Sequence, residues 1–362
     1  MMKSPKIRFK GFDGDWEQRK LGDVAQEFKS GNSLKADEID ITGDYPVYGG
    51  NGLRGYTSTY NHDGEYALIG RQGALCGNMN YSAGKAYFTE HAVVVKADEN
   101  NDTRFLYYML DTMNLGQYSD QSAQPGLAVN KLVKLENSFP KKEEQQQIGA
   151  YFRSLDHLIT LHQKKFEQLT ILKKYMLQKM FPQNGSDKPE IRFDGFTDDW
   201  EQRKLSDVVD VRSGRDYKHL EEGDIPVYGT GGYMLSVSEA LSDDEDAIGI
   251  GRKGTIDNPY ILRAPFWTVD TLFYAVPREK HDLNFVYGIF QNINWKAKDE
   301  STGVPSLSKA TINAVSTMTP DYEEQRLIGE YFSNLDHLIT LHQQKCDELR
   351  NAKKFMLQNM FI

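Results

Sequence analysis

The sequence predicts an α+β fold in which two mixed α/β domains are joined by two long antiparallel coiled-coil helices, with a pseudo-twofold internal repeat. Three observations lead to this prediction. The chain of 362 residues repeats itself after about 180 residues, each half carries a long heptad pattern, and each half contains short apolar runs bounded by Gly, Asn and Asp. A chain of this length can supply two domains with a core each.

The duplication is clearest at the start of each half. Residues 5–24 read PKIRFKGFDGDWEQRKLGDV and residues 189–208 read PEIRFDGFTDDWEQRKLSDV, so that 15 of 20 positions are identical. A second matching block covers residues 143–181 and 323–361, and both copies contain LDHLITLHQ. A repeat of this length is too long for a solenoid unit and is typical of a duplicated domain. The predicted segments are residues 1–142 (first globular head), 143–183 (first long helix), 184–320 (second head) and 321–362 (second long helix).

Within the heads, short apolar runs predict strands. Three of these runs are Tyr66–Ile69, Ala92–Val95 and Leu272–Val276, and turn-forming residues flank them. Such runs are typical of buried strands. We therefore expect mixed α/β heads.

The matched C-terminal blocks predict helices that pair along a hydrophobic seam. Their apolar residues alternate by four and three, which is the heptad spacing of a coiled coil. A helix of this size is on the order of 50 Å long, and its apolar stripe must be covered. We expect the two helices to pair in antiparallel fashion, with the heads at opposite ends. The predicted seam residues are Ile148, Phe152, Leu155 and Ile159 in the first helix, and Ile328, Phe332, Leu335 and Ile339 in the second.

The other faces of both helices are charged, and two interpretations stay open for them: a solvated surface or a docking surface for another subunit. The residues expected on these outer faces are Lys164, Lys165, Lys173, Lys174 and Lys179 on the first helix, and Glu323, Glu324, Glu330, Asp347 and Glu348 on the second.

Composition sets further limits. The formal net charge of −9 shows no basic excess of the kind that phosphate binding favours, but net charge averages over surfaces that serve different partners. The two cysteines, Cys76 and Cys346, lie in no C-x-x-C motif, which predicts neither a disulfide framework nor a metal site. No run has the length of a signal-peptide core or a membrane span. We expect a cytoplasmic protein that does not enter a membrane.

Candidate DNA-binding residues lie in or near the segments where the two halves differ most. Gly70-Arg71-x-Gly73 and Gly251-Arg252-x-Gly254 follow apolar runs and place an Arg on a tight turn. Arginine suits phosphates and guanine edges, but the motif also fits a turn that the fold requires, with the Arg in an internal salt bridge. The full candidate set is Asn32, Lys35, Arg54, Arg71, Gln72, Arg212, Arg215, Lys218, Arg252 and Lys253.

Complete enzyme motifs are absent from the sequence. It contains no Gly-x-x-x-x-Gly-Lys-Ser/Thr, no His-Glu-x-x-His and no Gly-x-Ser-x-Gly with plausible partners. A duplicated enzyme would be expected to show its catalytic set twice. The sequence therefore predicts no catalytic residues and no cofactor.

These residues together resemble a known family. A turn near Gly-x-x-Gly, the segment Gln124-Pro125-Gly126-Leu127, then Phe139-Pro140 and Glu143-Glu144-Gln145 before a long helix resemble the specificity subunits of Type I restriction-modification systems. The second half carries Thr319-Pro320 and Glu323-Glu324-Gln325 at the corresponding places. The resemblance spans nearly the whole chain. The chain is short for the family, which leaves open a shortened first recognition domain.

The resemblance implies two target-recognition domains that each read half of a bipartite, asymmetric double-stranded DNA target. The helices would set the spacer and dock two modification (methyltransferase) subunits, and restriction (translocase and nuclease) subunits would supply cleavage. Two alternatives stay open: a coiled-coil scaffold that binds only proteins, which the net negative charge favours, and a self-contained modification or nuclease enzyme.

Overall fold

The computed structural model describes residues 4–119, 126–183 and 185–362. It divides into two compact units, Met1–His162 with Gln344–Ile362 (unit 1) and Gln163–Gln343 (unit 2). Each unit thus contains one head and part of both long helices. The four segments predicted from the sequence divide the chain differently, because they assign each helix to a segment of its own.

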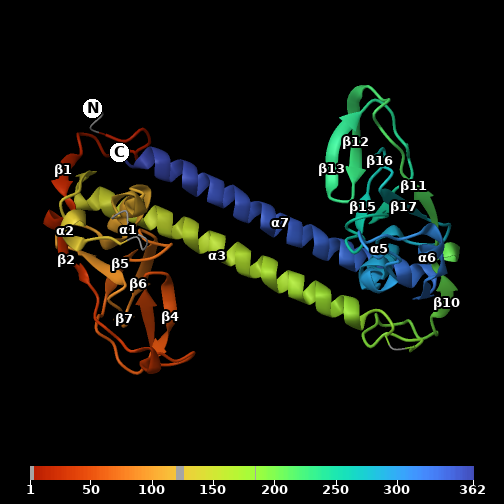
Figure 1. The fold of residues 1–362 in the computed structure, drawn as a ribbon, viewed down its shortest axis with the longest axis horizontal. Helices are drawn as coiled ribbons and strands as arrows, with labels where there is room; N and C mark the ends of the chain where they lie inside the picture. Colours follow the sequence, from red (N-terminus) through yellow and green to blue (C-terminus); the bar gives the residue numbers. More distant parts are fainter. Residues whose placement is uncertain (1–3, 120–125, 184) are drawn as a thin grey trace. The chain divides into compact units, whose positions relative to one another are not determined.

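Unit 1 contains a head built mainly from short strands (Figure 1). Its strands are β1 (Glu17–Lys20), β2 (Ala25–Ser30), β3 (Tyr45–Gly49), β4 (Gly52–Thr57), β5 (Glu65–Gly70), β6 (Met79–Ala83), β7 (Tyr87–Phe88), β8 (Ala92–Ala97) and β9 (Glu136–Phe139). Its α-helices are α1 (Thr103–Thr112), α2 (Val129–Leu132) and the first part of α3 (Lys142–Lys179), and short 3-10 helices span Leu21–Asp23, Ala36–Glu38 and Leu115–Tyr118.

Unit 2 repeats these elements in nearly the same order. Its strands are β10 (Glu201–Lys204), β11 (Val209–Ser213), β12 (Glu222–Gly229), β13 (Gly232–Val237), β14 (Ala247–Gly251), β15 (Tyr260–Leu262), β16 (Trp267–Thr268), β17 (Leu272–Pro277) and β18 (Ser316–Thr319). Its helices are α4 (Leu205–Val208), α5 (Leu283–Asn292), α6 (Lys309–Ala314) and the first part of α7 (Tyr322–Met360), with a 3-10 helix at Trp295–Lys298.

The two heads share one sheet topology. Unit 1 has a four-stranded sheet in the order β2-β8-β5-β6 and a three-stranded sheet in the order β4-β3-β7, and unit 2 has β11-β17-β14-β15 and β13-β12-β16. In both three-stranded sheets the central strand pairs with the last strand in parallel and with the hairpin partner in antiparallel fashion. The strands predicted from the apolar runs are confirmed, since they lie within β5, β8 and β17.

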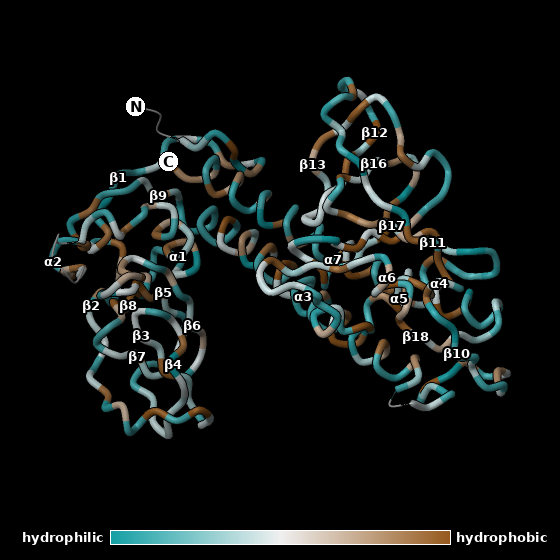
Figure 2. Tube along the Cα trace, turned by 45° about the vertical axis from the view of Figure 1, so that its right-hand side comes forward, coloured by the Kyte–Doolittle hydropathy of each residue, from teal (hydrophilic) through white to brown (hydrophobic). Residues whose placement is uncertain are grey.

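Each head core includes a residue from the end of a long helix. In unit 1 the ring of Phe361, just after α7, lies 5.4 Å from Phe105 of α1 and 5.8 Å from Phe152 of α3. In unit 2 the ring of Phe181, just after α3, lies 5.4 Å from Phe285 of α5. Brown hydrophobic segments mark this core around α5, β11 and β17 in Figure 2.

The residues predicted to form the seam are buried or half-buried in the structure. Ile148, Phe152, Leu155, Ile328, Phe332 and Leu335 are buried, and Ile159 and Ile339 are half-buried. The buried residues belong to the head cores as well as to the seam. In unit 1 the Cys346 thiol contacts the backbone oxygen of Ile159, while Lys353 pairs with Asp156. The later residue on α7, Lys353, thus contacts the earlier residue on α3, Asp156. The two helices are therefore antiparallel in unit 1.

Lys173 is not on the outer face, which corrects the expectation from the sequence. Its ammonium Nζ lies 2.5 Å from Asp336 Oδ1 in unit 2, and Lys353 Nζ lies 2.6 Å from Asp156 Oδ1 in unit 1. Lys173 and Lys353 occupy equivalent positions in the repeat, as do Asp156 and Asp336. The heptad pattern of apolar residues did not reveal this position, because a long lysine stem packs along a seam while its charged end reaches a carboxylate.

Glu324 is a second correction, because it is buried rather than on an outer face. Its carboxylate is 0% exposed and accepts two hydrogen bonds of 2.7 Å from Arg192. In unit 1, Glu144 is 1% exposed and accepts an equivalent pair from Arg8. The two matching blocks of each half therefore contact each other through a buried ion pair.

The glutamine of the Glu-Glu-Gln motif links the head to the start of the helix by hydrogen bonds. The side chain of Gln145 donates to the backbone oxygen of Pro140 and to Asn101 Oδ1, both at 2.9 Å. Gln325 donates to the backbone oxygen of Pro320 at the same distance. Three residues singled out in the sequence, Gln124, Pro125 and the boundary residue Asn184, lie outside the described residues.

Removal of Arg192 should destabilise unit 2 strongly. The Arg192→Ala variant leaves the Glu324 carboxylate buried without its partner, and we expect a loss of about 3–5 kcal/mol in the free energy of unfolding, measured by denaturant unfolding. Arg153→Ala, at an exposed position of α3, is the control and should change stability by less than about 0.5 kcal/mol. The double variant Arg192→Met, Glu324→Leu should recover most of the loss. A double variant as unstable as Arg192→Ala would contradict this account.

Candidate nucleic-acid interface

In the first head, three separate segments bring candidate residues together at the end of the β3–β4 hairpin. Arg54 lies on β4, Gln72 follows β5, and His91 precedes β8. With Asn51 of the hairpin turn they line a pocket of about 240 Å³. The sequence predicted Arg54 and Gln72 as DNA-binding residues, and the structure places them in the same pocket.

Backbone hydrogen bonds hold the Gly70-Arg71-Gln72-Gly73 loop in place. Arg71 N donates to the backbone oxygen of His91 at 2.9 Å, and Leu127 N donates to that of Arg71 at 2.9 Å. Gly73 has a φ of +83°, a conformation that glycine adopts without strain. The loop is therefore fixed from both sides, which leaves the exposed Gln72 side chain to face outward.

The second head builds the same framework around different side chains. Arg252 N donates to the backbone oxygen of Thr271 at 2.8 Å, and Leu307 N donates to that of Arg252 at 3.0 Å. Lys253 bridges to Ser306 as Gln72 bridges to Gly126. Lys253 thus occupies the position of Gln72, so that the two heads offer different groups at one place in the fold.

The two motif arginines contact backbone carbonyls rather than carboxylates. Arg71 Nη1 lies 3.4 Å from the backbone oxygen of Glu90, and Arg252 Nη1 lies 3.3 Å from that of Asp270. Among the residues that the structure describes, neither arginine forms the internal salt bridge considered from the sequence. Because a guanidinium carries five N–H donors, each side chain keeps donors for a further partner.

The next pair of candidates, Asn32 and Arg215, also lies at equivalent positions. Asn32 N donates to the backbone oxygen of Phe88 at 3.0 Å, and Arg215 N donates to that of Thr268 at 2.8 Å. Both side chains are exposed. Lys35 is exposed next to the 3-10 helix at Ala36–Glu38.

Lys218 is exposed beside the β12–β13 hairpin. It lines a groove of about 710 Å³ together with Tyr233 and Met234, but also with Glu221 and Glu222. The two carboxylates make this groove unfavourable for a phosphate.

Arg212 differs from the other candidates because carboxylates neutralise it. Its guanidinium lies 2.7 Å from Asp210 Oδ2 and 2.5 Å from Glu245 Oε2. Hydrogen bonds to Glu245 and Asp210 raise the pKa of Arg212. Because both carboxylates pair with its guanidinium, Arg212 is a poor candidate for a DNA contact.

Sequence reasoning missed His91, Asn51 and Met234. An alignment of the two halves shows which residues stand at equivalent places. His91, for example, directly precedes β8, and Thr271 directly precedes the equivalent strand β17. Differences between the halves at such matched positions are the signal that could have identified them.

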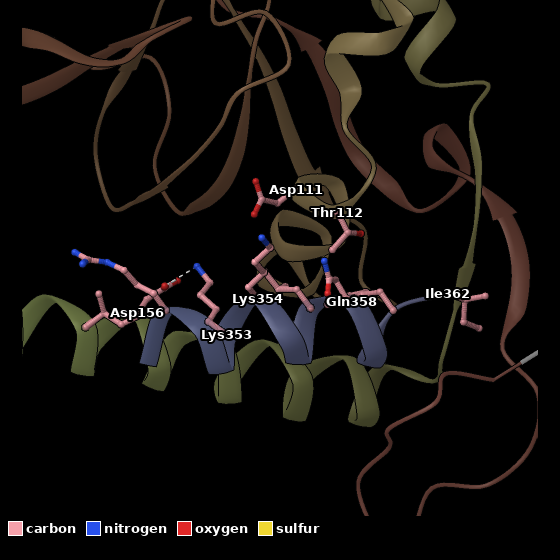
Figure 3. A pocket seen from close by; sticks show the side chains of 11 residues that line it. Asp111, Thr112, Asp156, Lys353, Lys354, Gln358 and Ile362 are labelled. Atoms are coloured by element: carbon pink, nitrogen blue, oxygen red, sulfur yellow. Dashed lines mark hydrogen bonds and ion pairs between the residues drawn. The ribbon is translucent and has the colours of Figure 1, made fainter. Parts of the chain in front are cut away.

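A larger pocket in unit 1, of about 720 Å³, lies where α1 meets the segments of α3 and α7. Figure 3 shows Asp111 and Thr112 of α1 above Lys354 and Gln358 of α7. Burial raises the pKa of Asp111. Lys353 already forms an ion pair with Asp156. Because charges of both signs and several apolar side chains line this pocket, it does not favour a phosphate backbone.

Comparison with known proteins identifies both halves. A family model described as Type I restriction modification DNA specificity domain matches residues 13–170 and 197–351. The Escherichia coli Type I restriction enzyme EcoprrI specificity subunit is 42% identical over 156 residues, which are 42% of this chain and 39% of that protein. The chain thus matches well under half of that relative's length.

Two further similarities extend over almost the whole chain. The Methanocaldococcus jannaschii Type I restriction enzyme MjaVIII specificity subunit is 22% identical over 94% of this chain and 90% of that protein. The crystal structure of the Type-I restriction-modification system S subunit from M. genitalium covers 99% of both chains with a TM-score of 0.81 and 18% identity, which shows a common fold.

The described helices include none with the length and hydrophobicity that a membrane span needs. Two matched copies of one domain, on the same framework of strands and helices, account for most of the chain. The chain therefore belongs to the family of the Type I restriction modification DNA specificity domain.

Proposed function

We propose that this chain is the sequence-specific DNA-binding subunit of a Type I restriction-modification complex, in which each head reads one half of a bipartite, asymmetric target. One observation carries the proposal. The two domain copies share a framework but present different exposed groups at equivalent positions, with Gln72 against Lys253 and Asn32 against Arg215. Different groups in the same geometry recognise different base pairs.

The acidic composition is compatible with this function when other subunits contribute phosphate contacts. Exposed basic groups lie on the heads at Arg54, Arg215, Arg252 and Lys253, while the remaining surface need not approach DNA. The protein-only scaffold, whose support was the net charge, does not account for two matches to a DNA specificity domain.

The long helices are the proposed docking site for two modification subunits. The outer face of each copy carries the same exposed leucine pair: Leu158 (42% exposed) and Leu161 (49%) in unit 1, and Leu338 (39%) and Leu341 (49%) in unit 2. Exposed apolar groups at repeated positions are typical of interaction surfaces. Because the pair occurs once per copy, we propose two equivalent docking faces.

In this proposal the partner subunits carry out the methylation and cleavage reactions. Modification subunits would flip and methylate the target base, and restriction subunits would translocate and cleave DNA. The chain itself would act in the cytoplasm without catalytic residues or a cofactor of its own. Helix length would set the spacer between the half-sites, because α3 connects the first head to the second along the chain.

The primary test is to co-express the chain with a candidate modification subunit in a host that lacks DNA methylation and to map methylated adenines by single-molecule sequencing. We expect a bipartite, asymmetric motif that disappears when this chain is omitted. Methylation that persists unchanged without the chain would favour the scaffold instead.

The spacer can be tested by removing one heptad from each helix at equivalent positions, residues 163–169 and 343–349, which leaves the leucine pairs of the proposed docking faces in place. The deletion keeps the four-three alternation of the seam and shortens each helix by about 10 Å. We expect the methylated motif to keep both half-sites and to change its spacer by roughly three base pairs. An unchanged spacer in a variant that still directs methylation would show that helix length does not set the spacer.

Docking can be tested by placing charge on one face at a time. Leu158→Glu with Leu161→Glu should remove one of two modification subunits, and Leu338→Glu with Leu341→Glu should remove the other, because each variant buries charge in one apolar contact. Native mass spectrometry of the complexes reports the count. Lys164→Glu, an exposed change on α3, is the control. Retention of two subunits by both double variants would exclude this face.

A further inference from the structure

We propose that one position of the β-hairpin sets base specificity in both heads: Arg54 reads a guanine in the first half-site, and Met234 contacts a thymine methyl in the second. This inference rests on the proposed function, since it assumes that the heads read DNA. It assigns one residue in each head and the type of base-pair edge that the residue recognises.

The two positions are equivalent in backbone pairing. In the first head Tyr48 pairs with Leu53 and Gly49 with Gly52, after an irregularity that begins at Val47. In the second head Tyr228 pairs with Tyr233 and Gly229 with Gly232, after the same irregularity at Val227. Arg54 and Met234 follow Leu53 and Tyr233, so they stand at the same place in the same hairpin.

Both side chains lie across the glycine that ends the first strand of the hairpin. A Cβ atom at Gly49 would come within 2.6 Å of Arg54 Cδ, and a Cβ atom at Gly229 would come within 2.7 Å of Met234 Sδ. The missing side chain at the glycine therefore lets Arg54 and Met234 lie flat on the backbone. The fold places residues of quite different chemistry in one orientation, which is how a shared framework can present alternative reading groups.

In the first head the surroundings offer hydrogen-bond donors. Within the described residues, no hydrogen bond or ion pair engages the Arg54 guanidinium, in contrast to Arg212. His91 Nδ1 lies 3.2 Å from Gln72 Oε1, which leaves the amide N–H groups as the donors that Gln72 offers. Glu90 supplies a carboxylate near this pocket, and its Oε1 lies 3.5 Å from His91 Nε2. Donors from Arg54 and Gln72 match the two acceptors, N7 and O6, on the major-groove edge of guanine.

In the second head the same position is apolar. Met234 is 48% exposed and its neighbour Tyr233 is 63% exposed. The groove beside them includes Leu220, and its carboxylates Glu221 and Glu222 disfavour a phosphate. An exposed thioether next to an aromatic ring suits the C5-methyl group of thymine, the apolar feature of the major groove.

The test uses the full chain in complex with its modification subunits, bound to a pool of duplexes randomised on both sides of a variable spacer and then sequenced. The wild type should enrich a bipartite motif. Arg54→Met should abolish the preference for one guanine in one half-site, by about ten-fold or more, and leave the other half-site unchanged. Met234→Arg should change a single position in the other half-site. Arg153→Met, an exposed change on α3, should change neither.

A second substitution keeps the inference testable if Arg54→Met yields no stable complex. Arg54→Gln should shift the preference at the same position from guanine to adenine, because glutamine pairs with N6 and N7 of adenine. Retention of guanine by this variant would overturn the inference.

Other results have distinct meanings. Uniform weakening over all sequences would show that Arg54 contacts a phosphate, and would overturn the assignment to a base. Changes in the same half-site from both Arg54→Met and Met234→Arg would refute the equivalence. A wild-type complex that enriches no motif would contradict the proposed function itself.

Discussion

The closure of each head core by a phenylalanine from the end of a long helix is the constraint on which the rest of the structure depends. Phe361 packs on Phe105 and Phe152 in unit 1, and Phe181 packs on Phe285 and Phe332 in unit 2. Burial of such a ring stabilises by about 1.5–3 kcal/mol. Because seam and head share these residues, neither helix can slip along the seam without opening a core.

Charge pairs reinforce this arrangement at both ends of the matched blocks. The Arg8–Glu144 and Arg192–Glu324 pairs fasten the N-terminal block of each half to the first turn of its helix. The Lys353–Asp156 and Lys173–Asp336 pairs join the two helices within each unit. Removing one partner of a buried pair such as Arg192–Glu324 is costly, because it leaves an uncompensated charge inside the protein.

In each head the candidate residues lie on a backbone framework that the two copies share. The hairpin turn, the loop after β5 or β14 and the segment before β8 or β17 are held by backbone hydrogen bonds, which do not depend on side-chain identity. The two copies keep the same backbone pairing although Arg54 corresponds to Met234, and Gln72 to Lys253. The duplication of one domain thus places different side chains at equivalent positions within one chain.

The sequence by itself determined the repeat, the helices and the strands, because these leave periodic or duplicated patterns along the chain. The heptads around Phe152 and Phe332 and the apolar run at Ala92–Val95 are of this kind. Only the tertiary structure decided which polar residues meet. Arg54, Gln72 and His91 come from three segments, Arg212 is neutralised by Glu245 from a distant loop, and Glu324 is buried by Arg192. Pairings between distant segments follow from chain topology rather than from local spacing, so no periodic pattern records them.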